Sequence, residues 1–203
     1  MTKTRRNAVL STTGAVLVAT VLVACGSSDD GSAPSDVSEL VPILAEDRQP
    51  RDTLPDATFA SVVESEDLVA DSSRLLRESD LDRQWVALDA SDNICLMVEL
   101  LSAEQDPTVD GSTVGSACVS PAAFQRQGLR ISTGDADHST VAAYLVPADV
   151  DLDAMTEAGI EQVDGGTSYA PQLFVVAPGG ADAAEGVAVE REDGGSFVIE
   201  RLR

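Results

Sequence analysis

The chain of 203 residues has few of the side chains on which active sites commonly depend. It contains one histidine and three cysteines, and aromatic residues make up 3% of it. Lysine occurs once, at Lys3. The rest of the chain therefore cannot supply the lysine of a phosphate-binding P-loop, of a Ser-x-x-Lys acylating site or of a Schiff base.

Positive charge is also scarce. Thirteen Lys and Arg stand against 35 Asp and Glu, which gives a formal net charge of −22. Such a surface repels nucleic-acid phosphates and anionic lipid head groups, so we expect neither as a direct partner. The acidity is typical of a solvated protein surface, or of adaptation to ionic surroundings, more than of an acidic binding site.

The one long apolar run lies at the N-terminus. Lys3, Arg5 and Arg6 precede residues 8–24, which carry no charge. This is the layout of a secretory signal. A run of about 17 residues is at the lower limit for crossing a hydrocarbon core of roughly 30 Å, so a permanent membrane span is the weaker interpretation.

The end of this run, Leu22-Val23-Ala24-Cys25, resembles the lipobox of bacterial lipoprotein precursors. The resemblance implies transfer of a diacylglycerol to the Cys25 sulfur, cleavage after Ala24 and acylation of the new amino terminus. It places the protein on the extracytoplasmic face of the cell membrane, held by lipid. The alternative is a free cysteine at the end of an ordinary signal or anchor.

The export route stays open. Thr4-Arg5-Arg6-Asn7-Ala8-Val9 is similar to a twin-arginine signal, which would export a folded domain, but paired arginines also occur in general secretory signals. Cleavage would remove Lys3, Arg5 and Arg6 and lower the net charge from −22 to −25. The acyl groups would then carry the whole membrane attachment.

Composition divides the chain into three parts. Residues 1–24 are the expected signal peptide, and residues 25–35 form a polar, Gly- and Ser-rich lipidated linker. Residues 36–203 are one ordinary domain's worth of chain.

Cys95 and Cys118 are predicted to form a disulfide. The export signal puts them where disulfides persist, and both have apolar neighbours. Closing the 23-residue span would stabilise the fold by roughly 3–4 kcal/mol in the chain-entropy model. The alternative, one reactive and one inert thiol, lacks a nearby histidine or cationic cluster to activate the thiol.

Short apolar segments separated by turn residues predict a single domain that is α+β or mainly β, with an antiparallel sheet and a few short helices. The clearest strands, Arg83–Asp89 and Asn93–Leu101, form a hairpin around Ser91-Asp92, with Trp85 in the core. Glu104–Gly115 is expected to be a loop, and Arg48–Pro55 an extended connection. The other expected strands are Leu129–Thr133, Thr140–Val146, Tyr169–Ala177, Val187–Glu190 and Ser196–Leu202.

Helical patterns are short. Asp36 caps a segment that Pro42 shortens or kinks, and Phe59 to Val63 indicates a short helix or turn. Pro121–Gln127, closed by Gly128, is predicted to form one or two turns. The short strands, paired cysteines and acidic composition are similar to those of uncharacterised envelope lipoproteins of high-GC Gram-positive bacteria, a similarity that implies no activity.

His138 is the single histidine, so a Ser-His-Asp site would have to use it. It follows Gly134-Asp135-Ala136-Asp137, which is typical of a polar turn, and no Gly-x-Ser-x-Gly motif occurs. We expect a surface-loop histidine and no catalytic residue. Carboxylate pairs for glycoside hydrolysis are possible among so many acids, but the sequence singles out none.

Asp149, Asp151 and Asp153 start like a helix-loop-helix calcium site. Ala154 replaces the glycine of the sixth position, and Ile160 replaces the glutamate of the twelfth. We therefore favour a strand or turn with Val150 and Leu152 facing inward, and keep calcium as an alternative. No metal and no cofactor is expected.

Together these patterns predict a lipid-anchored cell-envelope protein that acts as a binding or structural module. Its expected partners are the membrane, through the Cys25 lipid, and an envelope protein or ligand that the sequence does not identify. The alternative function is that of an extracytoplasmic hydrolase using carboxylates or His138.

Overall fold

The computed structural model describes residues 36–101, 113–133, 141–157, 165–176, 186, 188–191 and 193–198. The expected signal peptide, the lipobox residues Leu22-Val23-Ala24-Cys25 and the linker lie outside the described residues. So do His138 and Ile160.

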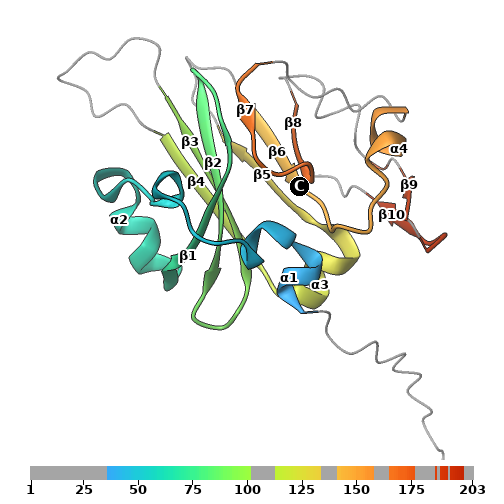
Figure 1. Cartoon of the computed structure of the whole chain (residues 1–203), viewed down its shortest axis with the longest axis horizontal. Coiled ribbons are helices and arrows are strands. Elements are labelled where there is room, and N and C mark those ends of the chain that lie inside the picture. Colours follow the sequence, from blue (N-terminus) through green and yellow to red (C-terminus); the bar gives the residue numbers. More distant parts are fainter. Residues whose placement is uncertain are drawn as a thin grey trace, which may run out of the picture. The chain divides into compact units, whose positions relative to one another are not determined.

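A first sheet is built mainly from consecutive antiparallel strands (Figure 1). Its order is β4-β3-β2-β1-β7. The strands are β1 (Leu68–Glu78), β2 (Asp82–Asp89), β3 (Ile94–Leu100), β4 (Thr113–Val119) and β7 (Thr167–Ser168). The predicted hairpin is confirmed as β2 and β3, whose turn contains Asp92 at a φ of 59°.

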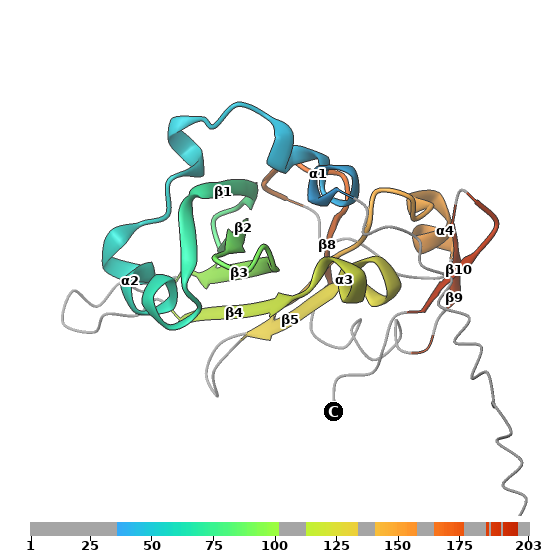
Figure 2. The same cartoon turned by 90° about the horizontal axis from the view of Figure 1, so that it is seen from below.

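A second antiparallel sheet has the order β5-β6-β8, from β5 (Leu129–Thr133), β6 (Val141–Leu145) and β8 (Leu173–Val176). The chain passes from the first sheet to the second through α3 (Pro121–Gln127), and β4 lies beside β5 (Figure 2). A two-stranded ribbon of β9 (Ala188–Glu190) and β10 (Ser196–Val198) ends the described chain, with Asp193-Gly194-Gly195 between the two strands. The predicted class, a mainly antiparallel domain with few short helices and one disulfide, is confirmed.

The helices begin and end where local chemistry requires. Asp36 accepts hydrogen bonds from the backbone N–H and the hydroxyl of Ser38 and so caps α1 (Val37–Leu40). Pro42 starts a separate 3₁₀ turn, η1 (Pro42–Ala45), which confirms the predicted break. The predicted α3 is confirmed as well, with Ser120 as its N-cap and Gly128 after its end.

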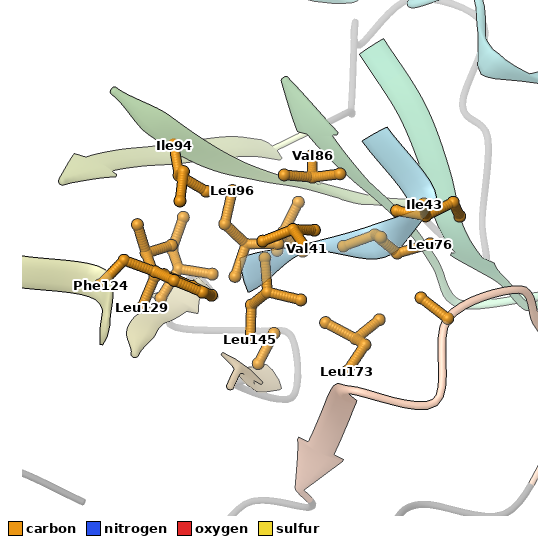
Figure 3. Packing of buried hydrophobic residues seen from close by; sticks show 14 of the residues in the cluster. Val41, Ile43, Leu76, Val86, Ile94, Leu96, Phe124, Leu129, Leu145 and Leu173 are labelled. Carbon is orange, nitrogen blue, oxygen red and sulfur yellow. The ribbon is translucent and has the colours of Figure 1, made fainter. Parts of the chain in front are cut away.

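Both sheets bury side chains on their two faces. On β3, the even-numbered residues Ile94 to Leu100 point into a central core that also receives side chains of the second sheet (Figure 3). The odd-numbered Cys95 and Met97 point to the opposite face. Alternation of polar and apolar residues is consequently weak in this strand.

Two smaller cores cover the outer faces. The α2 core lies between the first sheet and α2 (Asp56–Ser65). In this core the rings of Phe59 and Trp85 pack edge to face, with 5.1 Å between their centroids. The predicted burial of Trp85 is confirmed. The C-terminal core joins Tyr144 and Phe174 of the second sheet to α4 (Leu152–Glu157) and the β9–β10 ribbon.

One strand was missed, and three expectations about element bounds need correction. The sequence did not indicate β1, because Asp71 to Arg74 interrupt its apolar residues. β4 begins at Thr113, so the predicted loop extends too far at Gly115. The connection Arg48–Pro55 contains a 3₁₀ turn, η2 (Pro50–Asp52). The predicted strand at Tyr169 begins later, at Leu173.

Candidate functional site

The disulfide is the most chemically distinctive centre among the described residues. Cys95 of β3 and Cys118 of β4 are directly opposed in the strand register, and their sulfurs are bonded at 2.06 Å. Cys95 is fully buried and Cys118 is partly exposed. The predicted pairing is confirmed, and the alternative of a free reactive thiol at either position is wrong.

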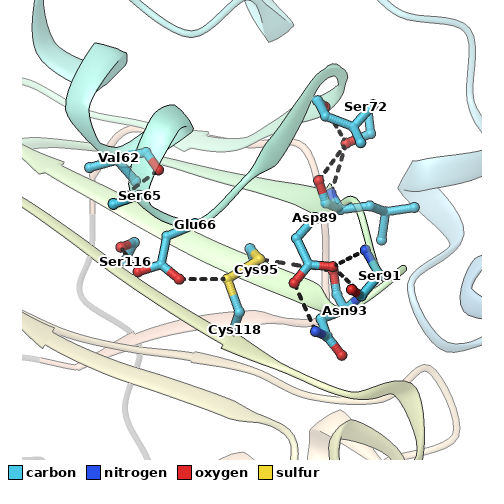
Figure 4. Close-up of a disulfide and its surroundings, with 12 residues drawn as sticks. Val62, Ser65, Glu66, Ser72, Asp89, Ser91, Asn93, Cys95, Ser116 and Cys118 are labelled. Carbon is cyan, nitrogen blue, oxygen red and sulfur yellow. Dashed lines mark hydrogen bonds between the residues drawn. A yellow bond between two sulfur atoms is a disulfide. The ribbon is translucent and has the colours of Figure 1, made fainter.

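A carboxylate faces the disulfide from α2. Glu66 caps the C-terminal end of this helix, and its Oε2 lies 3.7 Å from the Cys118 Sγ (Figure 4). The Ser116 hydroxyl donates to the Glu66 Oε1 at 3.4 Å and helps to hold the carboxylate in place. Because a disulfide sulfur has no hydrogen to donate, the sulfur does not neutralise this negative charge.

A second carboxylate, Asp89, lies on the other side of the sulfurs (Figure 4). Its oxygens accept from the Asn93 amide group at 2.7 Å and from the backbone N–H groups of Ser91 and Asn93 at 2.7 and 2.9 Å. Burial acts to raise the pKa of Asp89, but these hydrogen bonds outweigh it and hold the pKa below its usual range. Asp89 is therefore a fixed negative charge, whereas a general acid needs a raised pKa.

Ligand atoms of Asp89, Cys95 and Cys118 lie within 4.8 Å of one another. This is metal-ligand spacing, but each sulfur is already bonded to the other sulfur. Zinc binds the thiolate form of cysteine, which neither residue offers here. The oxidised centre thus lacks the donor set of a metal site.

Asp149 and Asp151, two of the three acids that resemble the start of a calcium loop, make structural contacts. The Asp149 Oδ2 pairs with Arg191 Nη1, and the Arg191 Nη2 donates to the backbone oxygen of Gln125. Asp151 Oδ1 accepts from the backbone N–H of Asp153 at 2.9 Å and of Ala154 at 3.2 Å, which makes it the cap of α4.

This segment also departs from the predicted strand or turn. Leu152 to Glu157 form a helix, although Val150 is buried and Leu152 packs partly inward as expected. Ala154 lies within that helix, where a calcium loop needs the sharp turn of a glycine. The described part of the segment therefore lacks the geometry of a calcium loop.

A hollow of about 260 Å³ opens beside α2. Its floor is apolar, and Arg48 at its rim forms an ion pair of 2.8 Å with the exposed Asp71. The lining residues are Arg48, Thr53, Leu54, Asp56, Phe59, Ala60, Val63 and Ala70. The hollow suits a small apolar group, and its described lining holds no nucleophile paired with a base.

Among the other buried carboxylates, Asp82 and Glu99 each have an arginine beside them. Arg77 Nη1 lies 2.6 Å from Asp82 Oδ1, and Arg83 Nη1 lies 3.7 Å from Glu99 Oε2. The Arg77–Asp82 pair compensates buried charge and joins β1 to β2, whereas Glu99 Oε2 accepts no hydrogen bond from the described residues. They give no support to the hydrolase alternative, and its histidine, His138, lies outside the described residues.

None of the helices in the described ranges is long and apolar enough to span a membrane. Comparison with protein-family profiles, with curated proteins and with solved structures finds no match to this chain.

Proposed function

We propose that this chain is a lipid-anchored protein of the cell envelope, held on the extracytoplasmic face of the membrane through Cys25 and acting there as a binding or structural module. The basic start, the uncharged run and Leu22-Val23-Ala24-Cys25 support the anchor. The scarcity of catalytic side chains in the sequence favours a module without enzymatic activity.

The observation that carries the proposal is the formed disulfide between Cys95 and Cys118. Disulfides persist outside the cytosol and are rare within it, because thiol systems keep cytosolic cysteines reduced. An interior that contains this bond agrees with export. The high negative charge agrees with lipid attachment, since the protein surface itself has no electrostatic affinity for anionic lipids.

Metabolic labelling of the full chain with a fatty-acid analogue tests the anchor. We expect label in the wild type and none in Cys25→Ala. The matched control is the double variant Cys95→Ala/Cys118→Ala, which retains Cys25 and should keep its label. Equal labelling of wild type and Cys25→Ala would contradict the proposal.

Location is tested separately by fractionation and by protease treatment of intact spheroplasts. The wild type should sediment with membranes and be digested from outside. A wild-type protein that stays protected until the cells are lysed would place the domain on the wrong side of the membrane.

The hollow beside α2 supports the binding part of the proposal, because apolar surface is concave there. A photoreactive amino acid at Ala60, which lines the hollow, tests this in cells. The control carries the same group at the exposed Glu39 of α1, on the opposite side of the first sheet. A specific adduct from position 60 alone is expected, and identical adducts from both positions would contradict a role for the hollow.

A further inference from the structure

We infer that the negative charges of Glu66 and Asp89 slow thiol exchange at the Cys95–Cys118 disulfide, so that this bond acts as a permanent link and not as an exchanging redox centre. The inference concerns the folded domain and does not depend on the lipid anchor.

Exchange begins when a thiolate attacks one sulfur of a disulfide and the other sulfur leaves. Cys95 is fully buried, so the accessible target is Cys118. The attacking anion must come close to the Glu66 Oε2, which lies 3.7 Å from this sulfur. Glu66 also caps the C-terminal end of α2, where the helix dipole adds partial negative charge.

The leaving step is hindered as well. Attack on Cys118 forms a mixed disulfide, breaks the bond between the protein sulfurs and releases Cys95 as a thiolate that keeps the electron pair. This anion would form in the α2 core beside Asp89. The arginine of β2, the strand beside β3, is Arg83, and it pairs with Glu99. Glu99 lies four residues, or roughly 13 Å along β3, from Cys95, so this arginine is not beside the Cys95 thiolate.

A full reduction needs a second thiolate. It attacks the reagent sulfur of the mixed disulfide and releases Cys118, after which both protein sulfurs take protons from water. The protein gains two electrons and two protons, and the small thiol reagent leaves as its own disulfide. Each step places an anion close to Glu66 or Asp89, so both steps are slowed by the same charges.

The test measures reduction of the full chain carrying Cys25→Ala, so that all released thiol comes from Cys95 and Cys118. Three reagents are compared after correction for their thiolate fractions: cationic cysteamine, neutral mercaptoethanol and anionic mercaptopropionate. Reduction should be slowest with mercaptopropionate. Glu66→Gln should accelerate reduction by mercaptopropionate about tenfold and reduction by cysteamine least, because a unit negative charge near the reacting sulfur is removed.

The matched control is Glu39→Gln, which removes the same charge from an exposed position of α1. It should leave every rate within twofold of the background protein. Equal rates for the Glu66→Gln protein and its background, or equal acceleration by both variants, would overturn the inference. The urea midpoint of each variant must match that of the background protein, so that reduction is measured on the folded state.

A second measurement needs no substitution at Glu66. Raising sodium chloride from 20 to 500 mM screens these two carboxylates together with the other charges of the acidic chain. It should accelerate reduction by mercaptopropionate while leaving reduction by cysteamine unchanged or slower. A reduction rate that is insensitive to salt with all three reagents would overturn the inference even if Glu66→Gln fails to fold.

Discussion

Arg77 and Asp82 form a buried ion pair in which Nη1 and Oδ1 lie 2.6 Å apart, with side chains only 8% and 4% exposed. The second guanidinium nitrogen of Arg77 donates to the backbone oxygen of Gly165 at 2.6 Å, and Ser79 Oγ donates to Asp82 Oδ1 at 2.9 Å. The pair thereby ties the turn between β1 and β2 to the segment that leads into β7.

Replacing Asp82 by Asn should lower the free energy of unfolding by about 3–5 kcal/mol, because the charge of Arg77 would remain buried without its counterion. Urea unfolding measures this. The control is Asp71→Asn, which breaks the exposed pair with Arg48 and should cost less than about 1 kcal/mol. Similar losses of unfolding free energy in the two variants would show that burial does not determine how much an ion pair contributes to stability.

Asp52 is buried and accepts from the backbone N–H of Leu75 at 2.9 Å and of Gln49 at 2.6 Å. Asp52→Ala should destabilise the domain by about 2–4 kcal/mol, since both donors lose their acceptor. Hydrogen exchange gives the local readout: the Leu75 and Gln49 amides should exchange faster than in the wild type. Unchanged protection of both amides would refute this role for Asp52.

Gly128 and Gly194 both have positive φ, of 64° and 82°. A Cβ on Gly128 would meet the Leu145 backbone oxygen at 2.8 Å and the Phe197 ring at 2.9 Å, whereas one on Gly194 would meet nothing within 4 Å. Gly194→Ala should cost about 1–2 kcal/mol from its backbone conformation, and Gly128→Ala about 3 kcal/mol or more. Thermal unfolding should rank them in that order, and the reverse order would contradict the close approach.

The lowered pKa of Asp89 makes stability depend on pH. Its ionised form stabilises the folded state above the ordinary value of 3.8, and this contribution is lost as the pH falls through the lower pKa of the folded protein. Asp89→Asn should therefore be less stable than the wild type by roughly 1 kcal/mol near pH 7, and the difference should shrink toward pH 3. Urea titrations at the two pH values measure it, and a constant difference would argue against ionisation as the cause.

The sequence was sufficient for those parts of the fold whose signals are local. The hairpin around Ser91-Asp92 followed from two apolar segments and a turn, and α3 followed from Pro121 and Gly128. The disulfide followed from there being two cysteines beyond Cys25.

The parts that were missed depend on distant contacts. In β1, Ser73 and Arg74 are buried because they donate to the backbone oxygens of Asp52 and Glu46, more than 20 residues away. β4 contains Gly115, and its strand conformation comes from pairing with β3. Local propensity has no access to such partners.

The same holds for the surroundings of the disulfide. The turn acids and amides near Asp89 form a local pattern that can be recognised, because Asp side chains often accept from the backbone two residues on. Glu66 lies 52 residues before Cys118, and nothing in the sequence connects them. The approach of the two follows from the packing of α2 on the first sheet.

The C-terminal core has a consequence for a chain that is still being made. The first sheet has four of its strands by residue 119, but the cover over Tyr144 and Phe174 of the second sheet, begun by Val150 and Met155, is complete only with Val189 and Phe197. An unfinished chain thus presents part of this aromatic surface. Chaperones can bind this apolar surface, and neighbouring unfinished chains can aggregate through it.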